Sequence, residues 1–316
     1  MKLALGVDIG GTKTSLTLGD SHGKILAKKI LPTLTGRRTH EGIKQISEGL
    51  LRLKADFSGA GKIKGIGVGI PGPIDPQAGT AQRSPNLRGW EGIRFKAYLQ
   101  KKLKLPVYIT NDANAAAIGE MLFGQGRNCR NFVYLTVSTG IGGGIVLGGR
   151  LLMGDSWGAG EIGHTIVQAR GERCGCGRRG CLEAYASGTA IAKFFQKNSR
   201  GSGRLSAESI AREARQNNFA AREAYCRAGF YLGIGLANLI NLLNPGKIIL
   251  GGSVTKSFSL FWPTMMKSVR AHAWPVLSKA CRIVKTDLEE GAGDLGALAL
   301  VFSPSSLRGA GPSCRE

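Results

Sequence analysis

The sequence predicts an α/β protein built as two lobes, and three observations carry this prediction. The chain has 316 residues, which is long for a single hydrophobic core and suits two domains of ordinary size. Short apolar stretches that end in glycine or a turn recur up to residue 110, as expected for buried strands that alternate with loops and helices. A second strand-rich stretch begins at residue 132, after the polar stretch 124–131. We therefore expect the lobes to join near 124–131.

The composition is that of a globular protein, with 42% hydrophobic and 20% charged residues. No window approaches the roughly 18 consecutive apolar residues that a membrane span needs. The N-terminus "MKLALGVDIGGTK" runs into a glycine loop without a small-residue cleavage site. We expect a cytoplasmic protein with no membrane partner. The seven cysteines, an odd number in such a compartment, argue against a disulfide framework.

The formal net charge of +22 raises the question of nucleic-acid binding, because phosphate neutralisation releases counterions. The basic residues are scattered as pairs and single positions, with no run interleaved with aromatic residues. We therefore expect no nucleic-acid partner. A generally basic surface also suits an acidic, phosphate-bearing substrate.

The first 20 residues predict a β-hairpin, because two apolar runs flank "GGTK". Bare amides at Gly10 and Gly11, with the Thr12 hydroxyl and the Lys13 charge, suit a phosphate. Asp8, at the end of the first strand, is then placed to hold Mg²⁺ through water. An ordinary glycine turn explains these residues equally well when they are taken alone.

Further strands are expected at 61–70 and 105–110. After the second of these, "VYITNDANAAAIGE" places Asn111 and Asp112 between a strand and an alanine-rich helix. An isolated aspartate at such a junction most commonly caps the helix. The turn-rich stretches 69–75 and 84–92 can be plain connectors.

A second glycine loop strengthens the phosphate hypothesis. In "STGIGGGI", residues 138–145, hydroxyl side chains again precede glycines between two apolar runs. The residues assigned to phosphate binding here are Thr139, Gly140, Gly142 and Gly143. Two such loops, one in each lobe, favour a phosphate chain held in a cleft. A third pair, Gly251 and Gly252, follows a strand and suits the approach of a nucleotide base.

The stretch "RCGCGRRGCLE", residues 173–183, admits a disulfide knot, a zinc knuckle for nucleic acid, or a metal clip with another purpose. One imidazole and three thiolates form a soft tetrahedral set that Zn²⁺ takes in structural sites. The ligands assigned to this site are His164, Cys174, Cys176 and Cys181. Such a site has no open position, so we assign the metal a structural role only.

Two carboxylates flank the cysteine cluster, Glu161 before the histidine and Glu183 after the last cysteine. A zinc knuckle would instead present aromatic or basic residues to bases. Carboxylates repel a phosphate backbone but accept hydrogen bonds from sugar hydroxyls. The clip is therefore interpreted as holding two carboxylates around a sugar.

In the last third of the chain, apolar residues recur at helical spacing over 219–243. The following "NPG" ends this helix, and "KIILGG" predicts a strand. The residues from Ser303 onward are rich in Ser, Gly and Pro, and we expect 303–316 to be a disordered tail.

The order of the motifs DIGGTK, GxxGPID, NDANAAAxGE, TGIGGG, GAGEIGH, CGCGxxGCLE and NPxxIxxGG resembles the ROK family of sugar kinases and repressors, within the actin, hexokinase and Hsp70 ATPase superfamily. The resemblance spans about residues 3–302. It implies an α/β fold with two ribonuclease H-like (actin-like ATPase) lobes and an interlobe cleft. The N-terminal lobe would span 1–122 and be completed by a helix near 293–302, and the larger lobe would span 123–292.

The resemblance also implies roles for particular residues. Asp112 becomes the base that takes a proton from a sugar hydroxyl, with ATP and Mg²⁺ as cofactors. The residues that match sugar contacts are Gly72, Asn86, Asn111, Asp112, Glu161, His164 and Glu183. Members of the family are mostly homodimers or homotetramers, and we expect one of these states.

The segments "PGPID" and "PNLRGW" look like the glucokinase branch of the family, since Pro73 stands where relatives that act on N-acetylmannosamine carry arginine. The expected reaction is ATP-dependent phosphorylation of glucose at its 6-hydroxyl. N-acetylglucosamine, mannose or fructose kinase activity is the alternative within the class. A non-catalytic sugar-sensing regulator is the alternative of another class, and we expect no DNA-binding domain because the core begins near residue 3.

Overall fold

The structure is a computed structural model that describes residues 1–57, 59, 61–82, 87–199, 205–288 and 291–307. The chain divides into two compact units. Unit 1 comprises Met1–Arg130, Gly144–Gly160 and Asp287–Glu316, and unit 2 comprises Asn131–Gly143 and Glu161–Thr286.

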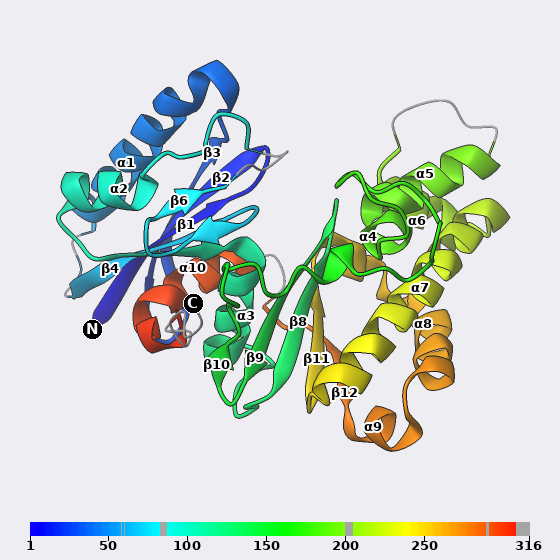
Figure 1. Cartoon of the computed structure of the whole chain (residues 1–316). Coiled ribbons are helices and arrows are strands. Elements are labelled where there is room, and N and C mark those ends of the chain that lie inside the picture. Colours follow the sequence, from blue (N-terminus) through cyan, green and yellow to red (C-terminus); the bar gives the residue numbers. More distant parts are fainter. Residues whose placement is uncertain (58, 60, 83–86, 200–204, 289–290, 308–316) are drawn as a thin grey trace, which may run out of the picture. The chain divides into compact units, whose positions relative to one another are not determined.

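Unit 1 is built on a five-stranded sheet with the order β3-β2-β1-β4-β7 (Figure 1). The strands are β1 (Lys2–Ile9), β2 (Lys13–Asp20), β3 (Ile25–Pro32), β4 (Lys62–Ile70) and β7 (Val107–Asn111). The first three strands pair antiparallel, with Asp8 opposite Ser15, whereas β4 lies parallel to both β1 and β7. The expected hairpin and the two further expected strands are therefore confirmed.

Helices cover both faces of this sheet. On one face, Leu3, Leu5 and Val7 of β1 share a core with helices α1 (Thr39–Ala55) and α2 (Phe95–Leu103). On the other face, Ala4 packs against Leu298 and Val301 of α10 (Ala292–Phe302), and α3 (Asp112–Phe123) packs along α10. The period-two alternation of β1 thus places α10 opposite α1.

Smaller elements complete unit 1. They are β5 (Ile74–Asp75), β6 (Thr80–Ala81), β10 (Arg150–Leu151) and the 3-10 turns η1 (Gly36–Arg38) and η5 (Pro304–Leu307). Strand β9 (Ile141–Leu147) leads the chain from unit 2 into unit 1 after Gly143. Residues 144–160 were expected in the second lobe but belong to unit 1, where Gly144 packs closely on Ala113 and Ala117 of α3.

In unit 2, β11 (Lys247–Gly251) lies between β8 (Phe132–Val137) and β12 (Arg282–Lys285), all parallel. Helices α7 (Phe219–Leu243) and α8 (Phe258–His272) pack along each other (Figure 1). The other helical elements are η2 (Ile162–His164), α4 (Glu183–Ala186), α5 (Gly188–Asn198), α6 (Ala207–Arg215), η3 (Ser253–Ser257) and α9 (Pro275–Ala280).

Helix α7 has the bounds expected from the sequence. The Asn218 side chain caps it by accepting the N–H of Ala221, and Asn244 ends it in the left-handed conformation at φ 43°. Among the described residues, α7 is the one helix that is long and apolar enough to cross a membrane, and half of that stretch is buried in the fold. A core helix of a soluble protein passes the same test, so this is weak evidence for a span.

The expected disordered tail falls partly outside the described residues. Pro304–Leu307 forms the 3-10 turn η5, while 308–316 are not among the described residues.

Candidate active site

The turn between β1 and β2 presents backbone amides. Two carbonyl oxygens of this turn accept hydrogen bonds from Thr33. The Thr33 hydroxyl donates to the carbonyl of Gly10 at 2.8 Å, and the Thr33 N–H donates to the carbonyl of Thr12 at 2.9 Å. In the described part of the chain, the amides of Gly11 and Thr12 have no hydrogen-bond partner. Lys13 is exposed beside them. Successive bare amides of this kind bind phosphate oxygens.

Three carboxyl groups and one ammonium meet behind this turn. Burial, reinforced by the charges of Asp112 and Asp294 and opposed by that of Lys28, raises the pKa of Asp8 from its ordinary value of 3.8 to about 7. The Lys28 ammonium donates to Asp294 Oδ2 at 2.6 Å. Asp294 is 3% exposed, so this ion pair is largely removed from water on the carboxylate side. The cluster is short of positive charge, which suits a site that binds a divalent cation.

The N-terminal turn of α10 lies directly against the Asp8 carboxyl group. A Cβ atom at Gly293 would overlap the Asp8 oxygens. Glycine is therefore required here by close approach, and α10 forms one wall of the cluster.

Asn111 and Asp112 occupy different positions at the start of α3. The Asn111 side chain caps the helix, since its Oδ1 accepts the N–H groups of Ala113 at 2.9 Å and Asn114 at 3.3 Å. Its Nδ2 donates to the carbonyl of Gly72 at 3.1 Å. Asp112 is the first helical residue, and its Oδ1 also accepts from Ala113. The capping role considered for Asp112 thus belongs to Asn111.

The remaining sugar contacts expected in unit 1 are only partly described. Gly72, at φ 95°, lies next to Asn111 through the hydrogen bond above. Asn86 lies outside the described residues. Downstream of it, Trp90 is buried and donates its ring N–H to the carbonyl of Leu34 at 3.1 Å.

In unit 2, the second glycine loop is a tight turn after β8. Ser138 donates its N–H to the carbonyl of Gly140 at 2.9 Å. The Ser138 hydroxyl bonds that of Ser253 at 2.9 Å, and the Thr189 hydroxyl donates to the carbonyl of Thr139 at 2.8 Å. This fixed turn leaves Thr139 exposed.

The other predicted glycines of unit 2 belong to neighbouring elements, although Gly252 packs closely against Val137 at the start of that loop. Gly142 and Gly143 belong to β9, because "IGGGIVL" forms a strand. Gly251 ends β11, and Gly252, at φ 90°, is the N-cap residue of η3. Only Thr139 and Gly140 of the predicted phosphate residues therefore sit in the loop itself.

The structure brings the four predicted metal ligands together. The ligand atoms of His164, Cys174, Cys176 and Cys181 all lie within 4.8 Å of one another. The sulfurs of Cys176 and Cys181 are 3.7 Å apart, as are Cys174 Sγ and His164 Nδ1. A tetrahedral site with Zn–S bonds of about 2.3 Å has sulfur–sulfur edges of about 3.8 Å. The residues fit a zinc ion.

Both predicted carboxylates are tied to this cluster. Glu161 Oε2 lies 3.8 Å from His164 Nε2, the ring nitrogen that does not face Cys174. Glu183 Oε1 lies 3.7 Å from Cys174 Sγ, while its Oε2 accepts the N–H of Ile141 at 2.9 Å. Glu183 thus connects the metal ligands to the first residue of β9, directly after the second glycine loop.

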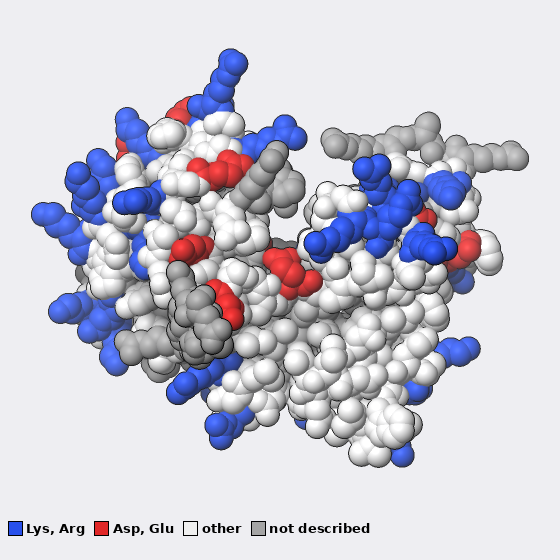
Figure 2. Space-filling model, in the orientation of Figure 1, with Lys and Arg blue, Asp and Glu red and all other residues white. Residues whose placement is uncertain are grey.

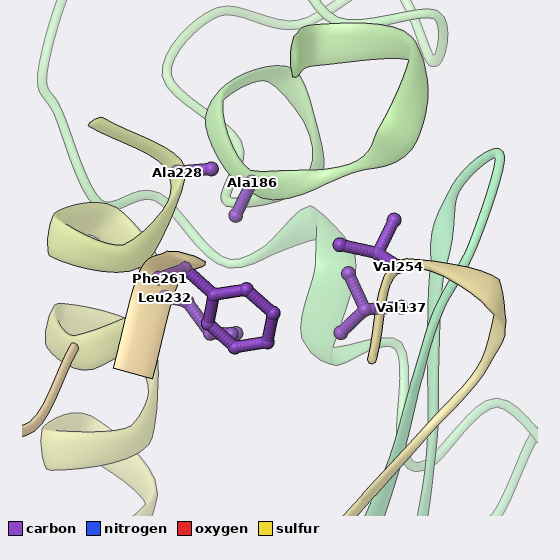
Figure 3. Close-up of a pocket in the computed structure, with 6 residues that line it drawn as sticks. All are labelled: Val137, Ala186, Ala228, Leu232, Val254 and Phe261. Carbon is purple, nitrogen blue, oxygen red and sulfur yellow. The ribbon is translucent and has the colours of Figure 1, made fainter. Parts of the chain in front are cut away.

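Figure 3 shows a separate pocket in unit 2, and it does not contribute to this site. Its lining is entirely apolar, with the residues Val137, Ala186, Ala228, Leu232, Val254 and Phe261. In the close-up, the Phe261 ring lies beside Leu232 and faces Val137 and Val254. The lining side chains offer no polar group to a sugar hydroxyl or a phosphate, so this pocket is interpreted as a packing gap.

The charge distribution follows the expectation of a generally basic surface. On the face that it presents, Figure 2 shows Lys and Arg spread around unit 1 and gathered mainly in the upper part of unit 2, above a broad area without charged residues, with fewer Asp and Glu. The chain has 43 basic and 21 acidic residues. On this face the basic residues form no single stripe.

Three residues of the carboxyl cluster, Lys28, Gly293 and Asp294, are not predicted from the sequence. They lie in two segments separated by more than 250 positions in the chain. The one local signal was an aspartate in the otherwise apolar stretch "AGDLGALALVF", because a lone carboxylate in a buried helix needs a partner.

The family model described as "ROK family" matches residues 4–303. The glucokinase of Thermotoga maritima is 34% identical over 309 residues, which cover 94% of this chain and 96% of that protein. The xylose repressor of Bacillus subtilis is 36% identical over 238 residues, covering 75% of this chain and 61% of the repressor.

Among solved structures, the ROK family glucokinase of Streptomyces griseus in complex with glucose and AMPPNP has a TM-score of 0.79 and 31% identity. The alignment covers 94% of this chain and 98% of that one. The expected α/β fold of the actin-like ATPase type is confirmed by this similarity.

Proposed function

The chain belongs to the ROK family, and we propose that it is an ATP-dependent hexose kinase that phosphorylates glucose at the 6-hydroxyl. One observation carries the proposal: within unit 1, the carboxyl groups of Asp112 and Asp8 interact next to a turn with bare amides. Phosphoryl transfer needs positioning and charge neutralisation more than covalent help. The cluster supplies a proton acceptor and a cation ligand beside a phosphate-binding turn.

Asp112 is the base. It takes the proton from the attacking sugar hydroxyl while that oxygen bonds the γ-phosphorus of ATP, and the bond to the β-phosphate oxygen breaks to release ADP. Asn111 is the N-cap residue of α3, so the helix does not require Asp112 as its cap, which supports the role of Asp112 as the base.

The nucleotide is bound through backbone groups. In unit 1 the amides of Gly11 and Thr12, with the Thr12 hydroxyl and Lys13, bind phosphate oxygens, whereas the N–H of Gly10, expected to be bare, donates to the carbonyl of Lys13 at 2.9 Å. The candidates in unit 2 are Thr139 and Gly140 for phosphate and Gly251 and Gly252 for the nucleoside. Gly142 and Gly143 lie in β9, next to the loop of Thr139 and Gly140, and do not bind phosphate themselves in this proposal. Asp8 holds Mg²⁺, which neutralises charge on the phosphates when bound.

The candidate hexose contacts within unit 2 are Glu161, His164 and Glu183, and those within unit 1 are Gly72 and Asn111. Asn86, the remaining candidate, lies outside the described residues. Carboxylate oxygens accept hydrogen bonds from sugar hydroxyls. The bonds already made by Asn111 leave one Nδ2 hydrogen for a ligand. A structural Zn²⁺ holds His164, Cys174, Cys176 and Cys181, and its supporting observation is the ligand spacing.

The test is ADP release from Mg·ATP in the presence of glucose, N-acetylglucosamine, mannose, N-acetylmannosamine or fructose. Release that depends on glucose and exceeds that with the other sugars is the expected result. Preference for another hexose would replace the substrate but keep the reaction. Absence of release with every sugar would contradict the kinase proposal.

The similarity to xylose repressors favours one second candidate, a sugar-binding regulator without catalysis. The same protein would then bind a sugar, measured by calorimetry, yet release no ADP. We also place the protein in the cytoplasm and expect a homodimer or homotetramer without nucleic-acid binding.

A further inference from the structure

Arg227 of α7 lies among three aromatic rings. Its guanidinium carbon is 4.7 Å from the ring centroid of Tyr185, 4.7 Å from that of Phe194 and 5.4 Å from that of Tyr231. A guanidinium Nη2 is also 3.7 Å from Glu172 Oε1. The Arg227 side chain is only 20% exposed. A planar, weakly hydrated cation is the side chain that suits such an aromatic site.

Tyr185 joins this group to the cysteine-rich segment by a second contact. Its hydroxyl oxygen accepts the N–H of Glu172 at 2.6 Å. It also fits so closely against Gly171 that a Cβ atom there would overlap it. Arg227 therefore acts on Glu172 in two ways. It pairs with the Glu172 carboxylate, and it packs on the ring of Tyr185, whose hydroxyl accepts the Glu172 N–H.

Both contacts lie two positions from residues of the candidate site. Glu172 precedes Cys174 by two residues, and Tyr185 follows Glu183 by two residues within the short helix α4. Glu183 in turn accepts the N–H of Ile141. A helix of four residues has little rigidity of its own, so the orientation of Glu183 depends on what α4 packs against.

We propose that Arg227 is a positioning residue that holds α4 and the segment 166–182 in place and thereby orients Glu183 for the sugar. The inference rests on the proposed sugar-binding role of Glu183. Arg227 itself touches no ligand in this account. The metal cluster fixes the segment through its three cysteines, and the Arg227 group fixes it at Glu172, two residues before the first of them.

The test compares Arg227→Met with Arg222→Met, each with its metal bound. Arg222 lies on the same helix but donates to the carbonyl of Ala214, so it is a matched control. Two quantities are measured: amide hydrogen exchange over 166–182, and the KM values for glucose and ATP.

In Arg227→Met we expect exchange over 166–182 to be faster by about tenfold, because the segment opens more often. The KM for glucose should rise by about fivefold to tenfold, with kcat and the KM for ATP changed by less than about twofold. Arg227→Lys keeps the charge without the planar stacking and should fall between wild type and Arg227→Met.

Unchanged exchange over 166–182, or an equal effect of Arg222→Met, would overturn the proposal. So would a parallel loss of kcat and of both affinities, which is the signature of general destabilisation. If Arg227→Met does not fold, Tyr185→Phe, which removes only the acceptor for Glu172, decides on the same two readouts. Should the wild type phosphorylate no hexose, the exchange rates still decide on Arg227, so the two failures are distinguishable.

Discussion

At the scale of single residues, the carboxyl group of Asp8 shows how the fold sets the charge of the site. Its pKa is raised to about 7 by burial and by the neighbouring carboxylates of Asp112 and Asp294. Between about pH 4 and pH 7 the folded chain keeps a proton that the unfolded chain has released. The free energy of unfolding contributed by this group therefore falls as pH rises through that window and stays low above it.

Replacing Asp8 by asparagine removes this electrostatic cost. We expect Asp8→Asn to raise the free energy of unfolding at pH 8, by on the order of 1.4 kcal/mol for each unit of pKa shift relieved. At pH 5 the difference should shrink. Thermal unfolding across this pH range measures it, with the exposed Asp155→Asn as control.

Magnesium binding provides a second test of the role of Asp8. Mg²⁺ alone should raise the melting temperature of the wild type more than that of Asp8→Asn, because binding the ion to the folded state stabilises it. A less stable variant at pH 8, or an equal response of both proteins to Mg²⁺, would show that Asp8 is not the strained carboxylate described here.

The sequence could indicate Asp8, Asn111 and Asp112 as candidate site residues, because each lies at or next to the end of an apolar strand. It could not identify Lys28 and Asp294. Their pairing depends on how α10 packs across β4, β1 and β2, so that Asp294 comes within reach of Lys28 on β3, which no local pattern encodes. The sequence also could not predict that Asn111 rather than Asp112 caps α3, since both side chains are able to cap a helix.

At the scale of elements, helix α10 leaves room for the Asp8 carboxyl group because residue 293 is a glycine. We expect Gly293→Ala to lower kcat/KM by at least about 100-fold, because its methyl group would displace the Asp8 carboxyl group. Gly291→Ala is the matched control, since a Cβ atom there would lie 3.7 Å from Leu295. Steady-state kinetics of both variants measure the difference. Equal, small effects would mean that α10 does not shape the cluster.

The cysteine-rich segment is the second element with a testable role. Cys176→Ser should release the metal, because one of its four ligands is lost. The free energy of unfolding should fall by on the order of a few kcal/mol. The KM for glucose should rise with it. Metal content, chemical denaturation and kinetics are compared with Cys226→Ser, which alters an exposed thiol outside the cluster. Loss of zinc with unchanged sugar binding would show that the segment does not organise the sugar site.

The strongly patterned elements could be predicted from the sequence. The β1–β2 hairpin has turn glycines between alternating runs, and α7 has apolar periodicity closed by Asn and Pro. The glycine content of 138–145 predicts a longer loop than the structure has, because strand pairing holds Gly142 and Gly143 in β9.

At the scale of the whole molecule, the net charge of +22 should affect the binding of anions more than of neutral ligands. Raising the ionic strength from about 0.05 M to about 0.3 M should raise the KM for Mg·ATP at least about twofold. The KM for glucose, an uncharged sugar, is the internal control and should stay constant. Equal salt dependence of both would exclude a role of the basic surface in nucleotide binding.

The central claim is that Asp112 takes the proton of the glucose hydroxyl during transfer from ATP. It is tested most directly by measuring glucose 6-phosphate formed from Mg·ATP and glucose by the wild type and by Asp112→Asn, with ATP affinity measured on both. We predict turnover by the wild type and a loss of at least about 100-fold in the variant, with ATP binding within about twofold. Substantial turnover by Asp112→Asn, or no product from the wild type, would contradict the claim.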